Sequence, residues 1–145
     1  MLQATPKQDE RLAQAMLLAP VFASVLIYFW IGSMNLLQGP SSSLAVVGIG
    51  TIVITSALAA ADANRLGIGA PGDPHKGTSP VGWAAFILLF WIVGYPAYLY
   101  RRKTYGAQSY LFVGILVGLL FIVSWFVMGS AIEVRQSEIR GIPGR

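Results

Sequence analysis

The chain has 145 residues, of which only 11% are charged and 55% are hydrophobic, whereas a soluble domain carries about 25% charged residues. It contains no cysteine, which excludes disulfides, thiolate metal sites and a cysteine nucleophile. The net charge is +4, and because the basic residues flank the apolar segments, we expect them to meet lipid headgroups rather than nucleic acid.

Residues 1–15 are predicted to form an N-terminal interfacial segment ahead of the first apolar run. Thr5 suits the N-cap of a helix, and Pro6 suits its first position. Pro20 then falls inside the helical pattern and predicts a kink or a break. Two interpretations stay open: a short helix over 7–19 that leads into a tilted span, or one continuous bent helix.

Four apolar segments are long enough to cross a bilayer, which needs about 20 residues. None alternates as a strand of a membrane barrel does, so each predicts a helix. The first is longer than the core of a signal peptide, and we expect it to be retained. We therefore predict an all-α, polytopic membrane protein whose membrane domain, residues 16–132, is a bundle of four transmembrane helices. The predicted spans are about 16–37, 44–61, 81–100 and 110–132.

The connections differ in length and character. Gly39 to Ser43 is a tight uncharged turn, which makes the first two spans a hairpin. The second loop, 62–80, contains too much Gly and Pro for a regular element. After the last span, residues 133–145 are predicted to be a polar tail that continues the helix to Arg140.

Charge predicts an orientation, although one cluster opposes it. With four spans, the two termini and the second loop share a side and carry seven Lys and Arg residues against three opposite. The positive-inside rule then predicts cytoplasmic termini. The cluster Arg101-Arg102-Lys103 contradicts this, unless the third segment is a re-entrant hairpin broken at Gly94 and Pro96. We expect the plain four-span topology.

Small residues predict faces for close helix packing. Gly114 and Gly118 are four residues apart and lie on one face of the fourth span, where another backbone can approach closely. Gly48, Ser56 and Ala60 share a face of the second span. We expect contacts inside the bundle, and packing between copies of the chain is the alternative.

Aromatic pairs recur deep in three of the predicted spans: Phe29-Trp30, Phe90-Trp91 and Trp125-Phe126. Because tryptophan usually prefers the membrane interface, mid-depth positions are less expected. The functional interpretation is a flat apolar pocket for a quinone, a pigment or a lipid tail. The structural interpretation, which we favour, is aromatic packing or lipid contact.

The sequence offers no catalytic or metal-binding set. His75 is the only histidine and lies in a Gly/Pro-rich loop, so we expect a solvated side chain rather than a metal ligand. No ionisable residue lies in the interior of a predicted span, although such residues usually mark ion or proton pathways. Ser24 and Ser56 have no activating base at depth. We therefore expect no enzyme activity, no metal and no cofactor.

Basic residues at the ends of the predicted spans are candidates for contact with lipid headgroups or a partner. They are Arg65, Lys76, Arg101, Arg102, Lys103, Arg135 and Arg140.

One part of the chain resembles a unit in small, uncharacterised prokaryotic membrane proteins. The residues concerned are Asp62-Ala63-Asn64-Arg65-Leu66-Gly67, Pro80-x-x-Trp83 and Tyr95-Pro96-x-Tyr98-Leu99-x-Arg101-Arg102. In such units, one span ends in an Asp-containing turn and the next closes with an aromatic-Leu-basic signature. The resemblance covers about 40 residues and implies a prokaryotic plasma (inner) membrane. It implies no activity.

The sequence favours a non-enzymatic accessory subunit or self-associating scaffold of a membrane complex, with the bilayer, copies of itself or other membrane subunits as partners. One alternative is an oligomeric transporter or channel for a small solute. Neutral polar residues would line its path: Asn35, Thr51, Thr55, Ser56 and Ser124. Another alternative is a binder of an apolar cofactor or lipid between the aromatic pairs.

Overall fold

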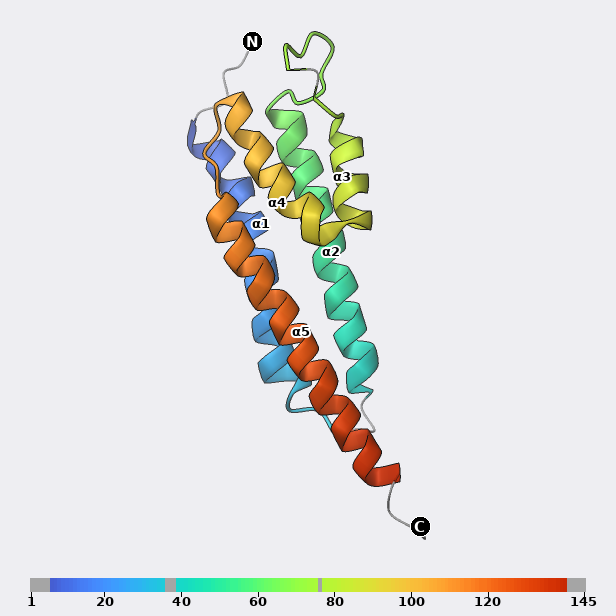
Figure 1. Ribbon diagram of the computed structural model, residues 1–145. Coiled ribbons are helices and arrows are strands. Elements are labelled where there is room, and N and C mark those ends of the chain that lie inside the picture. The colour runs from blue at the N-terminus through green and yellow to red at the C-terminus, as the bar shows by residue number, and fades with distance from the viewer. Residues whose placement is uncertain (1–5, 36–38, 76, 141–145) are drawn as a thin grey trace.

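The structure is a computed structural model that describes residues 6–35, 39–75 and 77–140 (Figure 1). Over these ranges the chain is helical or irregular and contains no strand. Five α-helices and two short helical turns of other types follow each other along the chain. They are α1 (Pro6–Leu26), the π-helical turn η1 (Ile27–Ile31), α2 (Pro40–Arg65), α3 (Pro80–Leu89), α4 (Trp91–Arg101), the 3-10 turn η3 (Arg102–Tyr105) and α5 (Leu111–Arg140).

Within the described ranges, three helical segments are long and apolar enough to cross a membrane. They cover Glu10–Ile31 with 22 residues, Pro40–Arg65 with 26 and Leu111–Ile139 with 29, against the roughly 20 that a span needs. Large apolar side chains remain exposed along them, among them Phe29 and Phe112. So much apolar surface is typical of a protein that faces lipid. These segments match the first, second and fourth predicted spans.

The predicted third span, 81–100, is wrong as a single helix. It consists of α3, with 10 residues, and α4, with 11, which are separated at Phe90, where φ is −129° and ψ is 51°. At 1.5 Å per residue each helix is only about 15 Å long, and the two form a hairpin (Figure 1). Gly94 permits this hairpin, because a Cβ there would lie 3.0 Å from the Cα of Ile87 in α3. The break thus precedes the predicted position at Gly94 and Pro96.

The hairpin determines how the ends of the helices are distributed. The start of α1, the loop between α2 and α3, the end of α4 and the start of α5 gather at one end of the bundle, here called the loop end (Figure 1). The turn η1, the start of α2 and the end of α5 gather at the other, the tail end. Helices α1 and α5 therefore run in the same direction, so the N-terminal end of the first described helix and the C-terminal end of the last lie at opposite ends of the bundle. Two termini on one side, as we expected, would need a fourth complete crossing.

Helix α1 continues through Pro20, so the interpretation as one continuous helix is the one observed. Proline has no N–H, and the carbonyl of Met16, four residues earlier, therefore loses its usual helical donor. The hydroxyl of Tyr95 in α4 donates a 3.1 Å hydrogen bond to this carbonyl. Ser24 in turn donates its hydroxyl to the carbonyl of Pro20 at 2.9 Å. The proline is accommodated because the hairpin supplies the missing donor.

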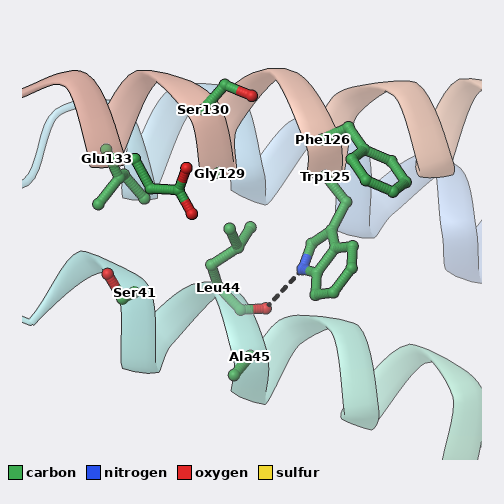
Figure 2. Close-up of a pocket in the computed structure, with 9 residues that line it drawn as sticks. Ser41, Leu44, Ala45, Trp125, Phe126, Gly129, Ser130 and Glu133 are labelled. Carbon is green, nitrogen blue, oxygen red and sulfur yellow. Dashed lines mark hydrogen bonds between the residues drawn. The ribbon is translucent and has the colours of Figure 1, made fainter.

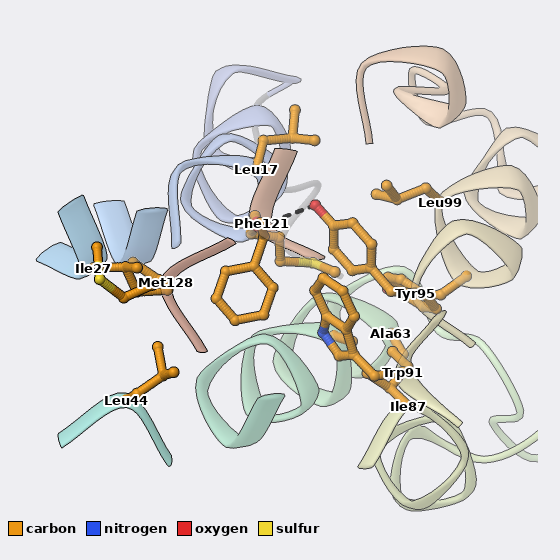
Figure 3. Close-up of a cluster of buried hydrophobic side chains, with 14 of the residues drawn as sticks. Leu17, Ile27, Leu44, Ala63, Ile87, Trp91, Tyr95, Leu99, Phe121 and Met128 are labelled. Carbon is orange, nitrogen blue, oxygen red and sulfur yellow. Dashed lines mark hydrogen bonds between the residues drawn. The ribbon is translucent and has the colours of Figure 1, made fainter. Parts of the chain in front are cut away.

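The core lies where the hairpin meets α1, α2 and α5 (Figure 3). Trp91 stacks on Tyr95 with ring centroids 5.3 Å apart and meets Phe121 of α5 edge to face. The indole N–H of Trp91 donates to Thr55 of α2 at 2.9 Å. Toward the tail end, Met128 continues this core. The first residues of α4 thereby connect the hairpin to α2 and α5.

Candidate functional site

A buried ion pair at the loop end, here called the clamp, connects the end of the hairpin to the end of α2. Asp62 of α2 and Arg102 of η3 are each 1% exposed, and Arg102 Nε donates to Asp62 Oδ2 at 2.6 Å. The same carboxylate oxygen accepts the hydroxyl of Tyr98 at 2.6 Å, and Arg102 Nη1 donates to the carbonyl of Gln108 at 3.0 Å. Trp83 of α3 lies edge to face against Tyr98. The clamp therefore joins α2, α3, α4 and the segment that leads into α5.

The clamp collects the residues that carried the resemblance. Asp62, Trp83, Tyr98 and Arg102 come from its three separate sequence blocks and meet in one contact network. One candidate for contact with lipid headgroups is corrected here. Arg102 is buried and its charge is paired with Asp62 inside the fold, so its side chain is not available to a headgroup. A buried pair of this kind is sensitive to the loss of either partner.

A second polar cluster orders the loop between α2 and α3. Oδ2 of Asp73 accepts the backbone N–H of Gly69 at 2.8 Å, that of Gly77 at 2.9 Å and the hydroxyl of Tyr105 at 2.7 Å. Oδ1 accepts the N–H of His75 at 2.9 Å. Gly69 has a φ of +70°, which favours glycine, and a Cβ there would meet the backbone of Ser79. The Gly/Pro-rich loop is therefore ordered around one carboxylate.

Hydrogen bonding shifts the ionisation of this cluster. The Tyr105 hydroxyl lowers the pKa of Asp73 well below its usual range; partial desolvation acts in the opposite direction, and the three backbone N–H bonds lower it further. Desolvation and the bond to Asp73 raise the pKa of Tyr105 above its ordinary value. Arg101 lies over the Tyr105 ring at 5.8 Å and donates to the carbonyl of His75 at 3.0 Å. His75 faces Tyr105 edge to face, and its cluster contains no second imidazole or thiolate ligand.

The third feature is an apolar groove between α2 and α5, below the tip of the hairpin. Its volume is about 800 Å³, within the range of small-molecule sites. The tip closes it toward the loop end, because α3 and α4 are each less than half as long as α2 and α5. Aliphatic and aromatic side chains line it: Ala45, Gly48, Ile49, Ile52, Leu88, Leu89, Phe90, Trp91, Ile92, Val93, Phe121, Ile122, Trp125 and Phe126.

The groove continues toward the tail end into a second hollow of about 500 Å³ (Figure 2). The two share Ala45, Trp125 and Phe126. Here the lining becomes partly polar, with Ser41, Ser130 and Glu133 beside Leu44, Gly129 and Ile132. The indole N–H of Trp125 donates to the carbonyl of Leu44 at 3.4 Å. The groove is thus apolar beneath the hairpin and polar at its tail-end mouth.

Two of the three predicted aromatic pairs meet at this groove. Phe90-Trp91 forms its end at the hairpin tip, and Trp125-Phe126 lies where the two hollows join. The third pair, Phe29-Trp30, belongs to η1 and is exposed, with Phe29 at 79%.

The glycines predicted for close packing take part in two different contacts, one between α5 and α4 and one between α2 and α5. A Cβ on Gly114 would clash with Cδ1 of Leu99 in α4, whereas one on Gly118 would lie 3.8 Å from Trp91. A Cβ on Gly48 would lie 3.3 Å from Nε1 of Trp125. Gly114 and Gly118 of α5 therefore face the hairpin, and Gly48 faces the groove.

The remaining packing candidates, Ser56 and Ala60, do not reach the groove. Ser56 is buried and donates its hydroxyl to the carbonyl of Ile52 at 2.7 Å. Ala60 is partly buried.

The predicted headgroup contacts occupy both ends of the bundle. Arg65 and Lys103 are exposed at the loop end, and Arg101 there is half-buried against Tyr105. Arg135 is exposed near the tail end. Lys76 lies outside the described residues, as does the side chain of Arg140.

No protein-family model, curated protein or solved structure matches the chain.

Proposed function

We propose that the chain is an integral membrane protein with three spans and one re-entrant hairpin. The lengths of α1 with η1, α2 and α5 support three crossings. The hairpin helices, each about 15 Å long, match half of a hydrocarbon core that is about 30 Å thick. Phe90 at the tip would then lie near the middle of the bilayer. A prokaryotic inner membrane, implied by the resemblance, is part of this proposal.

The same topology places the cluster Arg101-Arg102-Lys103 on the same side as the other basic residues of the loop end, so the cluster no longer opposes the positive-inside rule. Among the described residues, six Lys and Arg positions lie in helices near the loop end and two lie near the tail end. The six are Lys7, Arg11, Arg65, Arg101, Arg102 and Lys103, and the two are Arg135 and Arg140. The positive-inside rule then favours a cytoplasmic loop end, with the end of α5 on the opposite side.

Given this topology, we propose that the protein binds the hydrocarbon chain of a lipid in the groove and performs no catalysis. The groove itself is the observation that supports the proposal. Its lining is almost wholly apolar, and it lies in the half of the bundle that the hairpin leaves unfilled. A bilayer supplies hydrocarbon chains at high concentration, and burying one against Trp91 and Trp125 recovers dispersion contacts that an empty groove would lose.

The structure gives less support to a transport path. The neutral hydroxyls of Thr51, Thr55, Ser56 and Ser124 each donate to a carbonyl of their own helix. Thr55 also accepts the indole of Trp91. Hydroxyls engaged in this way do not offer successive binding positions to a solute. An accessory subunit remains part of the proposal, because a lipid-binding protein without catalysis exerts its effect through the membrane or another subunit.

Lipid retention through purification tests this function. The variant Ala45→Phe places a ring where the two hollows join, and Ala57→Phe adds the same ring at an exposed position of α2 outside the groove. Native mass spectrometry after mild detergent purification should find bound lipid on the wild type and on Ala57→Phe. The Ala45→Phe variant should lose most of it.

Equal lipid retention by all three proteins would contradict the proposal. So would a wild-type protein without lipid whose oligomer dissociates on Ala45→Phe, since a second copy of the chain would then be the occupant.

A further inference from the structure

The groove has a charged mouth at its tail end, which the apolar lining alone does not require. The carboxylate of Glu133 points from α5 into the space between α5 and α2 (Figure 2). Among the described residues it has no ion-pair partner. Ser41, in the first turn of α2, lines the other wall and accepts a hydrogen bond from Gln136 at 3.3 Å. The mouth therefore presents an unneutralised carboxylate beside an apolar chamber.

The distance between the two ends of the groove fits one leaflet. Phe121, near the hairpin tip, and Glu133, at the mouth, are 12 residues apart on α5, or about 18 Å at 1.5 Å per residue. Half of a hydrocarbon core is about 15 Å. A ligand with its chain against Phe121 would thus bring its headgroup to Glu133, at the tail-end surface.

We propose that the occupant is a phospholipid with a primary ammonium headgroup, drawn from the leaflet at the tail end. This inference rests on the proposed function and adds the headgroup to it. One acyl chain lies between α2 and α5 below Phe90, and the ammonium group pairs with Glu133. Charge complementarity selects this headgroup: an anionic headgroup would be repelled by the carboxylate, whereas an ammonium group neutralises it at the edge of a low-dielectric region.

The test uses the full chain reconstituted into vesicles of equal phosphatidylethanolamine and phosphatidylglycerol, followed by extraction and native mass spectrometry of the retained lipid. Four proteins are compared: wild type, Glu133→Gln, Ala45→Phe and the matched control Glu138→Gln, an exposed carboxylate on α5 outside the groove lining. The wild type and Glu138→Gln should retain phosphatidylethanolamine in roughly fivefold excess, the effect of a partly exposed ion pair. Glu133→Gln should retain the same amount of lipid without the excess.

The outcomes separate this inference from the proposed function. If Glu133→Gln keeps the excess, or if the wild type prefers phosphatidylglycerol, the headgroup assignment is overturned while lipid binding stands. If Ala45→Phe retains as much lipid as the wild type, the groove does not hold the lipid and both proposals fall. Both proposals are supported if Glu133→Gln retains lipid without the excess of phosphatidylethanolamine, if Ala45→Phe loses most of its lipid, and if Glu138→Gln behaves as the wild type.

Discussion

The hydroxyl of Tyr95 donates a hydrogen bond to the carbonyl of Met16, the acceptor that Pro20 deprives of its helical N–H. Tyr95 is 1% exposed, so a lost bond would leave this carbonyl without a partner. We predict that Tyr95→Phe lowers the free energy of unfolding by about 1–3 kcal/mol. In a Pro20→Ala background, the new alanine N–H bonds to Met16, and the same substitution should cost less than about 1 kcal/mol.

Unfolding of the four proteins by denaturant in detergent, followed by circular dichroism, measures this coupling. A cost for Tyr95→Phe that is equal in both backgrounds would show that the hydroxyl does not replace the missing donor.

The ion pair between Asp62 and Arg102 should behave differently from exposed charges nearby. We predict that Asp62→Asn or Arg102→Gln alone lowers the free energy of unfolding by about 3–5 kcal/mol, because either leaves a charge buried without its partner. The double substitution Asp62→Leu/Arg102→Met should recover much of this loss. Arg65→Gln, at the exposed end of α2, is the control and should change stability by less than about 0.5 kcal/mol. A single variant as stable as this control would refute the clamp.

The two glycines of the α5 motif should respond unequally to alanine. Gly114→Ala places a methyl group on Cδ1 of Leu99, which is fully buried and cannot move freely, so we predict a loss of about 1–3 kcal/mol. Gly118→Ala meets only Trp91 at 3.8 Å and should be neutral or slightly stabilising, since alanine favours the helix. Thermal unfolding of both variants measures the difference. Equal losses, together with loss of a dimer, would instead indicate packing between copies.

The length and apolar composition of the uncharged segments were sufficient to predict the three long apolar helices of the described chain. It failed at 81–100, where α3 and α4 have the composition of a single span. The turn at Phe90 depends on the contact of Gly94 with Ile87 across the hairpin, and although Gly94 and Pro96 suggested a possible break, the sequence does not show that contact. The charge conflict at Arg101-Arg102-Lys103 was the signal that the sequence offered.

The clamp was less predictable than the helices. Asp62 and Arg102 are 40 positions apart in the sequence. The basic neighbours of Arg102 suggested contact with lipid headgroups instead of a buried ion pair. Only the fold brings them together. The resemblance did select both, together with Trp83 and Tyr98, without indicating that they touch. An apolar pocket between the aromatic pairs was one interpretation of the sequence, but the position of the groove could not be predicted, since it depends on where the hairpin ends.

The carboxylate of Asp73 should keep the loop ordered in acid. Its pKa is lowered in the folded protein, so its contribution to stability is present above its ordinary pKa of 3.8 and is lost only as the pH falls through the depressed folded value. We predict that the amide resonances of Gly69 and Gly77 stay unchanged between pH 7 and about pH 4. Tyr105→Phe removes the largest cause of the shift, and these resonances should then move at higher pH. Titration of the wild-type carboxyl near 3.8 would contradict this.

Sidedness of labelling separates the hairpin from a fourth span. Because the natural chain has no cysteine, single cysteines at Thr78, Thr104 and Ser137 can each be labelled with a membrane-impermeant maleimide in intact cells and in inverted vesicles. All three positions are exposed; Thr78 precedes α3, Thr104 follows α4, and Ser137 lies near the end of α5. With a re-entrant hairpin, Thr78 and Thr104 react from the same side, which we predict to be cytoplasmic, and Ser137 reacts from the opposite side. A complete third crossing would separate Thr78 from Thr104 and place Ser137 with Thr78, and it would leave the groove without its closing tip.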